Sequence, residues 1–285
     1  MKDKLMPFVK KLGKEIKDDR VTGLAAEQAY YYMLSIFPMI ILLLSLLPYL
    51  SIDPEEAIGF MQTVMPGETA NVFQENIVEI ISKPNGGLLT FGIVGTIWSA
   101  SNGMRAFIRA MNTAFDVEET RSFIKARLVS IGLTFGLILT LIIALMLPVF
   151  GDVIIDFLNS YLNIPEQIEI LFRVLRWVIA ISVMIVILAV LYKVAPNKHY
   201  PFKHVLPGAI FATVVWQLIS LGFSFYLNHF ANYSATYGSL GGVIILMLWL
   251  FLTGLALVLG GEINAIYHRS HSSSVSKEED EALTV

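Results

Sequence analysis

The chain consists of long apolar runs without charge, separated by shorter segments that hold most of its charged residues. A helix needs about 20 consecutive apolar residues to cross the hydrocarbon core of a bilayer. Most of the runs reach this length, and the longest, from Val205 to Gly261, is long enough for two crossings divided by a polar cluster at 228–234. The pattern therefore predicts six transmembrane helices, over residues 28–50, 86–110, 128–150, 171–194, 206–227 and 240–266.

The segments between these runs show helical periodicity of their own. In the first outer loop, Phe73, Ile77 and Ile80 fall on one face and the glutamates fall elsewhere; the loop over 152–170 has a similar pattern. Both suit amphipathic helices that pack on the bundle, or that cap an outward-facing cavity. The segment over 5–20 is basic and amphipathic, which favours attraction to anionic headgroups. We expect an all-α, polytopic membrane bundle of six transmembrane helices, with amphipathic helices in the outer loops and at the N-terminus.

The same pattern divides the chain into three regions. Residues 1–23 form the basic amphipathic segment, and residues 24–268 form the six-span transmembrane domain. Residues 269–285 carry no apolar periodicity and are predicted to be a disordered cytoplasmic tail.

Composition excludes several classes of protein. The chain is 55% hydrophobic and 15% charged, whereas soluble domains are about 45–50% apolar and about 25% charged. The net charge of −3 gives no support for binding nucleic acid. The absence of cysteine excludes disulfides and cysteine-ligated metals.

The distribution of Lys and Arg predicts the orientation in the membrane. With the N-terminus inside, every Lys and Arg except Lys83, Arg173 and Arg176 falls on the cytoplasmic side. Because cytoplasmic segments carry an excess of these residues, both termini are predicted to be cytoplasmic.

Polar residues follow one face of the second predicted span at spacings of four, three and four positions: Trp98, Asn102, Arg105 and Arg109, with Asn112 close behind. Polar groups inside a bilayer are costly and are therefore candidates for function. This face suits an interhelical hydrogen-bond network whose arginines extend to the headgroups. It equally suits a cationic lining for an anionic substrate or a lipid headgroup.

Glu262 is the only acid in the last predicted span, and Asn264 lies beside it. An ion pair with Arg105, Arg109 or Lys193 would offset the cost of its burial. The alternative is a carboxylate that couples transport to protons.

The outer stretch over 226–242 is uncharged and amphipathic, and Tyr237 is its candidate for substrate contact. This stretch suits a re-entrant entry to the last span, or a tight loop with aromatic anchors.

Several catalytic signatures are missing from the sequence. It has no P-loop, no HExxH motif and no set of His, Asp or Glu at metal-ligand spacing. We therefore expect no cofactor, no metal site and no enzymatic activity.

Successive motifs resemble those of the YihY/BrkB family of bacterial inner-membrane proteins. They are YYYMLSIFP from Tyr30, SNGMRA from Ser101, NTAFDVEETR from Asn112, SATYGSLGG from Ser234 and GGEINA from Gly260. The resemblance implies a multi-pass, six-span helical protein of the bacterial cytoplasmic membrane. Members have been labelled ribonuclease BN, virulence factors and transporters, and one subgroup is linked to lipid export. The residues do not support the ribonuclease label, because no catalytic metal cluster is visible in the sequence.

The sequence leads to one favoured function and two rivals. We expect a transporter or flippase-like protein for a lipid or another amphiphilic or anionic cargo, without an ATPase of its own. The rivals are a non-catalytic membrane scaffold and, last, a membrane-bound ribonuclease. The expected partners are membrane lipids and the cargo, with no nucleic acid, and the oligomeric state is left open.

Overall fold

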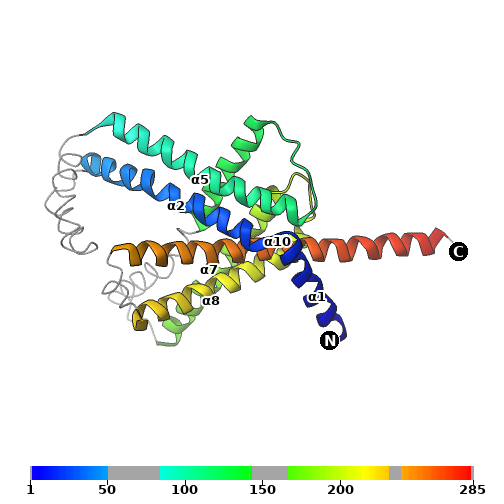
Figure 1. Ribbon diagram of the computed structural model, residues 1–285. Coiled ribbons are helices and arrows are strands. Elements are labelled where there is room, and N and C mark those ends of the chain that lie inside the picture. Colours follow the sequence, from blue (N-terminus) through cyan, green and yellow to red (C-terminus); the bar gives the residue numbers. More distant parts are fainter. Residues whose placement is uncertain (1, 51–83, 141, 143–165, 231–238, 284–285) are drawn as a thin grey trace.

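The computed structural model describes residues 2–50, 84–140, 142, 166–230 and 239–283. Over these ranges the chain is helical and contains no strand, which confirms the all-α prediction for this part. The helices are α1 (Lys2–Asp18), α2 (Val21–Leu46) with the 3-10 turn η1 (Leu47–Leu50), α5 (Gly86–Ala114), a helix over Phe123–Thr140, α7 (Glu166–Val194), α8 (Phe202–Phe230) and α10 (Ser239–Leu283) (Figure 1).

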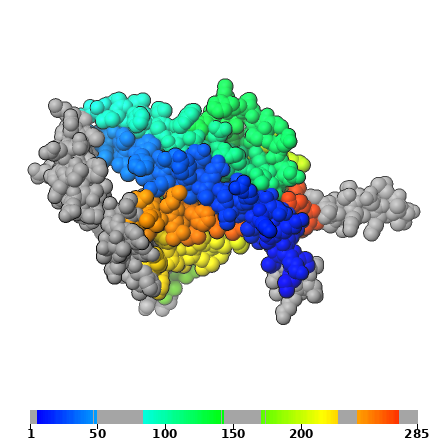
Figure 2. All heavy atoms as spheres, in the orientation of Figure 1, coloured from blue at the N-terminus to red at the C-terminus, as the bar shows by residue number. Residues whose placement is uncertain are grey.

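The long helices form a bundle around α10. This helix packs against α2, α5 and α8, and α7 packs on α8. Figure 2 shows α10 between α2 and α8 on the face in view. At one end of the bundle, α1 leaves at an angle and α10 projects beyond its neighbours (Figure 1). We call this the α1 end; there α2 begins, α5 and α7 end, and α8 begins.

Five helices are long and apolar enough to cross a membrane: Val21–Leu46, Phe123–Thr140, Ile170–Val194, Phe202–Tyr226 and Gly241–His271. They match five of the six predicted spans. The sixth, predicted at 86–110, corresponds to α5. Its 29 residues suffice for a crossing, but its glycine, serine, asparagine and arginine residues make it more polar than the five. The chain is thus a multi-span membrane protein in which α5 differs from the other long helices.

The buried core lies toward the α1 end. Phe107 and Met111 of α5, Tyr192 of α7 and Val258 of α10 are at most 1% exposed. Many other large apolar side chains, such as Leu218, lie on the outside of the bundle. A helix that is apolar on all sides suits contact with protein on one face and lipid on the other.

Two helix contacts bring backbones unusually close. On α5, a Cβ added to Gly92 would lie 2.7 Å from the Cα of Leu42 on α2. On α8, a Cβ added to Gly208 would overlap the carbonyl oxygen of Gly260 on α10. Glycine at these positions therefore lets α5 approach α2, and α8 approach α10.

The predictions for the N-terminal segment, the C-terminal tail and the outer loops have different outcomes. The amphipathic N-terminal helix is confirmed as α1. The tail from 269 onward was predicted to be disordered, but α10 continues through it to Leu283. Residues 270–283 contain neither glycine nor proline, and lysine, glutamate and alanine favour continuation of a helix.

Some predictions fall outside the described residues. They are the amphipathic helices expected within 51–83 and 152–165, the rest of the 128–150 span, and Tyr237.

Candidate functional site

The polar face predicted on α5 exists, and its first part binds an arginine from the next helix. Arg127 stacks on Trp98, with 3.7 Å between its guanidinium carbon and the ring centre. Its Nη1 donates to Asn102 Oδ1 at 2.6 Å, and its Nη2 donates to the carbonyl oxygen of Trp98 at 3.0 Å. Arg127 is only 7% exposed. The sequence marked this residue only as a loop charge, because nothing local shows that it reaches back to α5.

Arg105 lies next to this arrangement. Its guanidinium carbon is 5.6 Å from the ring centre of Phe123, and it is close enough to Arg127 for the two charges to repel each other. Within the described ranges, neither guanidinium forms an ion pair with a carboxylate. Arg105 of α5 and Arg127 of the next helix are thus two neighbouring cations that have no carboxylate partner among the described residues.

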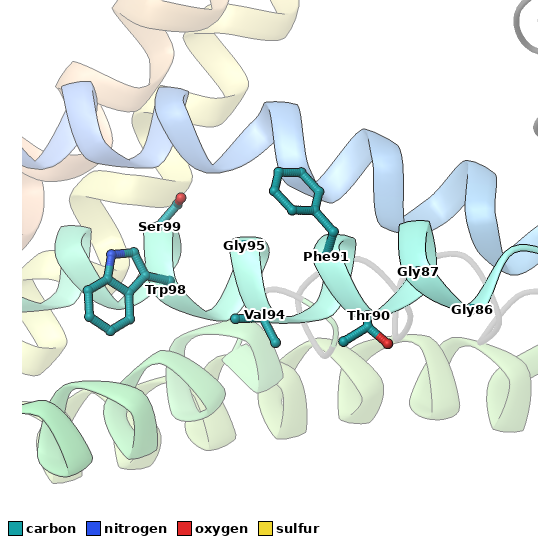
Figure 3. A pocket seen from close by; sticks show the side chains of 8 residues that line it. All are labelled: Gly86, Gly87, Thr90, Phe91, Val94, Gly95, Trp98 and Ser99. Atoms are coloured by element: carbon teal, nitrogen blue, oxygen red, sulfur yellow. The ribbon is translucent and has the colours of Figure 1, made fainter.

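An open cavity of about 750 Å³ lies along the other half of α5 (Figure 3). Its lining residues are Gly86, Gly87, Thr90, Phe91, Val94, Gly95, Trp98 and Ser99. Figure 3 shows Thr90, Val94 and Trp98 leaving one side of the helix, and Phe91 leaving it on another. The volume is within the range of small-molecule sites, about 300–1,000 Å³. Trp98 belongs to both the cavity lining and the Arg127 contact, so Arg127 lies next to one end of this apolar groove.

Arg109 has a different partner. It donates to Glu27 of α2 in an ion pair that is partly exposed. One of the two alternatives for Glu262, an ion pair with Arg105, Arg109 or Lys193, does not form among the described residues. For Arg109 the reason is that the start of α2 lies beside the end of α5 and supplies Glu27 instead.

Asn112 takes part in a hydrogen-bond network that joins the segment after α5 to the segment after α7. Its Nδ2 donates to Glu119 Oε2 at 3.0 Å, and its Oδ1 accepts the Asn197 N–H at 2.8 Å. The Arg121 Nε donates to Glu119 Oε1 at 2.8 Å, and the Arg121 Nη2 donates to the Ala195 carbonyl oxygen at 2.6 Å. Both polar ends of Asn112 are thus engaged by the protein, so we assign it a structural role. The sequence reasoning missed its partners, which all lie in connections between helices.

Asn264 holds α8 against α10. Its Oδ1 accepts the backbone N–H of Gly208 at 2.7 Å, and its side chain is fully buried. Nearby, the Tyr192 hydroxyl donates to the Leu257 carbonyl oxygen at 2.7 Å and fixes α7 to the same helix. Asn264 therefore belongs to helix packing rather than to a cavity.

Glu262 lies in a cluster of carboxylates. It is fully buried (0% exposed) and faces Glu15 and Asp19, with one carboxylate oxygen of each residue within 4.8 Å of the others. Neither oxygen of Glu262 accepts a hydrogen bond from an N–H or hydroxyl group in the part of the chain that the structure describes. Arg269, further along α10, donates to Glu15 Oε1 at 2.9 Å and to the Ala114 carbonyl oxygen at 3.1 Å.

The turn between α1 and α2 creates this cluster. The Asp19 N–H donates to the Glu15 carbonyl oxygen at 2.9 Å, so Asp19 stays on the helical path of α1. Arg20 then adopts a left-handed conformation with φ of 52°, which ends that path, and α2 begins at Val21. The i, i+4 spacing sets Glu15 and Asp19 on one face. Burial, together with the neighbouring Glu15 carboxylate, raises the pKa of Asp19.

Sequence reasoning found Glu262 but not its neighbours. The cluster joins opposite ends of the chain, so no local metal-ligand spacing could reveal it. The available signal was the i, i+4 spacing of Glu15 and Asp19 in a segment that is mostly basic and also contains Asp18. Three carboxylates thus meet in the structure although no metal-ligand spacing is visible in the sequence.

Comparison with known proteins places the chain among membrane proteins. The family model for virulence factor BrkB matches residues 12–284. YfkH of Bacillus subtilis (strain 168), named as a ribonuclease-like protein, is 41% identical over 264 residues, which cover 93% of this chain and 96% of YfkH. UPF0761 membrane proteins match a shorter stretch: that of Tolumonas auensis is 41% identical over 75 residues, covering 26% of this chain and 25% of the relative.

No solved structure matches the chain. The resemblance seen in the motifs is confirmed by the family model, which spans nearly the whole sequence, and by the relative that matches along almost its full length. The chain belongs to the virulence factor BrkB family.

Proposed function

We propose that the chain transports an anionic amphiphile, with a lipid as the favoured cargo, and that it does so without hydrolysing ATP itself. The observation that carries the proposal is the groove along α5, which is apolar for most of its length; its lining residue Trp98 contacts Arg127, and Arg105 lies close to Arg127. An acyl chain would occupy the apolar part, and the anionic headgroup would meet the two guanidinium groups.

The electrostatics support this cargo. A cation inside a bilayer needs a counter-charge, because an unpaired one costs several kcal/mol. Arg127 is buried, and among the described residues it contacts the neutral groups of Asn102 and Trp98. A phosphate or carboxylate headgroup would supply the missing negative charge, and guanidinium groups bind such anions through paired hydrogen bonds.

We further propose that the α1 end faces the cytoplasm of a bacterial cell. The support is the concentration of Lys and Arg in the segments that meet at this end, since such residues are retained on the cytoplasmic side. The headgroup site would then lie toward the cytoplasmic leaflet.

A lipid-translocation assay tests the proposal. The purified chain is placed in liposomes that contain an anionic lipid with a labelled headgroup, and a membrane-impermeant quencher is added. Sealed liposomes without transport lose about half of the signal, because only the outer leaflet is accessible. We expect quenching to go beyond half, and Arg105→Gln and Arg127→Gln to slow this phase roughly tenfold, as expected for the loss of one charged hydrogen-bonding group.

Lys125→Gln is the matched control. It removes one positive charge two positions before Arg127, from an exposed side chain, and should leave the rate unchanged. Quenching that stops at half, for anionic and zwitterionic lipids and with or without a proton gradient, would refute lipid transport and favour the scaffold. Equal slowing in all three variants would refute the assigned headgroup site.

Under this proposal the chain is not an enzyme. The carboxylate cluster is the feature that a metal-dependent nuclease would use, so the decisive measurement is RNA cleavage by the purified chain with Mg²⁺ or Mn²⁺. We expect no cleavage above that of a mock preparation. Cleavage that is lost in Glu262→Gln would contradict the proposal.

A further inference from the structure

Glu262 is a buried carboxyl group that accepts no hydrogen bond from an N–H or hydroxyl group among the described residues, and it faces the carboxyl groups of Glu15 and Asp19. Removing a charge from water costs several kcal/mol unless the charge is paired. Arg269, a neighbouring cation, directs its two Nη atoms to the Ala114 carbonyl oxygen and to Glu15 rather than to Glu262. The environment of Glu262 therefore favours a positively charged ligand between the three acids.

The charge of the cluster indicates the charge of that ligand. Three carboxylates and one guanidinium have a net charge of −2 when all are ionised. A single shared proton would neutralise half of this, whereas a divalent cation would neutralise all of it.

We infer that Glu15, Asp19 and Glu262 bind one divalent cation at the junction of α1 and α10. The donors are oxygen atoms only, which suits Mg²⁺, Ca²⁺ or Mn²⁺ rather than a thiolate- or imidazole-preferring metal. The oxygens lie within 4.8 Å of one another, and two ligands on opposite sides of Ca²⁺ are about 4.6–5.2 Å apart. One cation with oxygen ligands at about 2.3–2.6 Å could therefore contact all three acids with little rearrangement.

The site joins two parts of the fold. Glu15 and Asp19 belong to α1 and the turn that follows it, and Glu262 belongs to α10 in the bundle. Bound cation would therefore hold α1 against α10, beside the ion pair between Glu15 and Arg269. Removing the cation leaves mutual repulsion of carboxylates at the same place.

Metal binding to the full chain tests this inference. The purified protein is reconstituted in zwitterionic nanodiscs, which lack anionic headgroups, stripped with EDTA and titrated with MnCl₂ while electron paramagnetic resonance reports free Mn²⁺. We expect one Mn²⁺ per chain, displaced by Mg²⁺ or Ca²⁺. Asp19→Asn and Glu262→Gln should each weaken binding about tenfold or more, since even outer-shell changes cost 10–100-fold.

Asp18→Asn is the matched control, because it removes the same charge from the neighbouring exposed side chain. It should change the affinity by less than about threefold, as expected for a screened surface charge. If Glu262→Gln does not fold, as judged by circular dichroism and gel filtration, Asp19→Asn and Glu15→Gln decide the test. Absence of Mn²⁺ binding, or equal binding by Asp18→Asn and Asp19→Asn, overturns the inference.

Discussion

Replacing Gly208 by alanine should separate α8 from α10. The added Cβ would overlap the Gly260 carbonyl oxygen and lie 2.6 Å from the Asn264 side-chain amide. The overlap with the carbonyl involves backbone on the facing helix, so rotation of a side chain cannot relieve it and the helices must move apart.

The cost follows from two contributions. Overpacking of a tight contact costs about 1–3 kcal/mol. Moving the helices apart also weakens the 2.7 Å hydrogen bond from the Gly208 N–H to Asn264, which contributes about 1 kcal/mol. The total, about 2–4 kcal/mol, corresponds to a roughly 30- to 900-fold change in the unfolding equilibrium.

Gly222→Ala is the matched control, since it makes the same substitution on the same helix. No atom lies within 4 Å of a Cβ added there, and alanine is favoured over glycine inside a helix by roughly 0.5–1 kcal/mol. This variant should be as stable as the parent chain or slightly more stable.

The assay is reversible unfolding of the purified chain in mixed micelles with increasing sodium dodecyl sulfate, followed by circular dichroism and tryptophan fluorescence. Gly208→Ala should unfold at a clearly lower detergent fraction than the parent, and Gly222→Ala should not. Identical unfolding midpoints for the two variants would refute the close contact between α8 and α10.

Three further outcomes are expected. Tyr192→Phe removes the hydroxyl that donates to Leu257, and should cost about 0.6–1.7 kcal/mol in the same unfolding assay, as for other hydrogen bonds between membrane helices. Glu27→Gln removes the partly exposed partner of Arg109 and should cost no more than about 1 kcal/mol; a loss of several kcal/mol would contradict a solvent-screened pair. A spin label on Lys11→Cys, in a chain that has no native cysteine, should become more mobile when EDTA removes Mg²⁺, and unchanged spectra would contradict a cation that holds α1.

The positions of the long helices could be predicted because the membrane imposes a simple rule on sequence. A crossing helix must be apolar over its whole length, so charge-free runs mark the spans. The same rule set α5 apart, because its polar face stands out against apolar neighbours. Asn102, Arg105 and Asn112 were therefore found as polar positions from the sequence alone.

The partners of these residues could not be predicted, because they depend on how the helices pack. The sequence indicates only that Arg127 is a charged residue in a loop. Its stacking on Trp98 becomes visible in the folded structure. Glu262 was expected to meet arginines, but the turn at Arg20 directs Glu15 and Asp19 toward it. Glycine is the residue that usually indicates a left-handed backbone conformation. Because this position is Arg20, the turn could not be predicted from the sequence.

The length of α10 has a mechanical consequence. Its 45 residues extend over about 68 Å at 1.5 Å per residue, more than twice the roughly 30 Å of a hydrocarbon core. One unbroken rod therefore runs from the far end of the bundle, past the α8 crossing and Glu262, into the aqueous phase. A tilt of α10 inside the bundle would therefore displace the projecting turns as well, because both belong to one continuous helix.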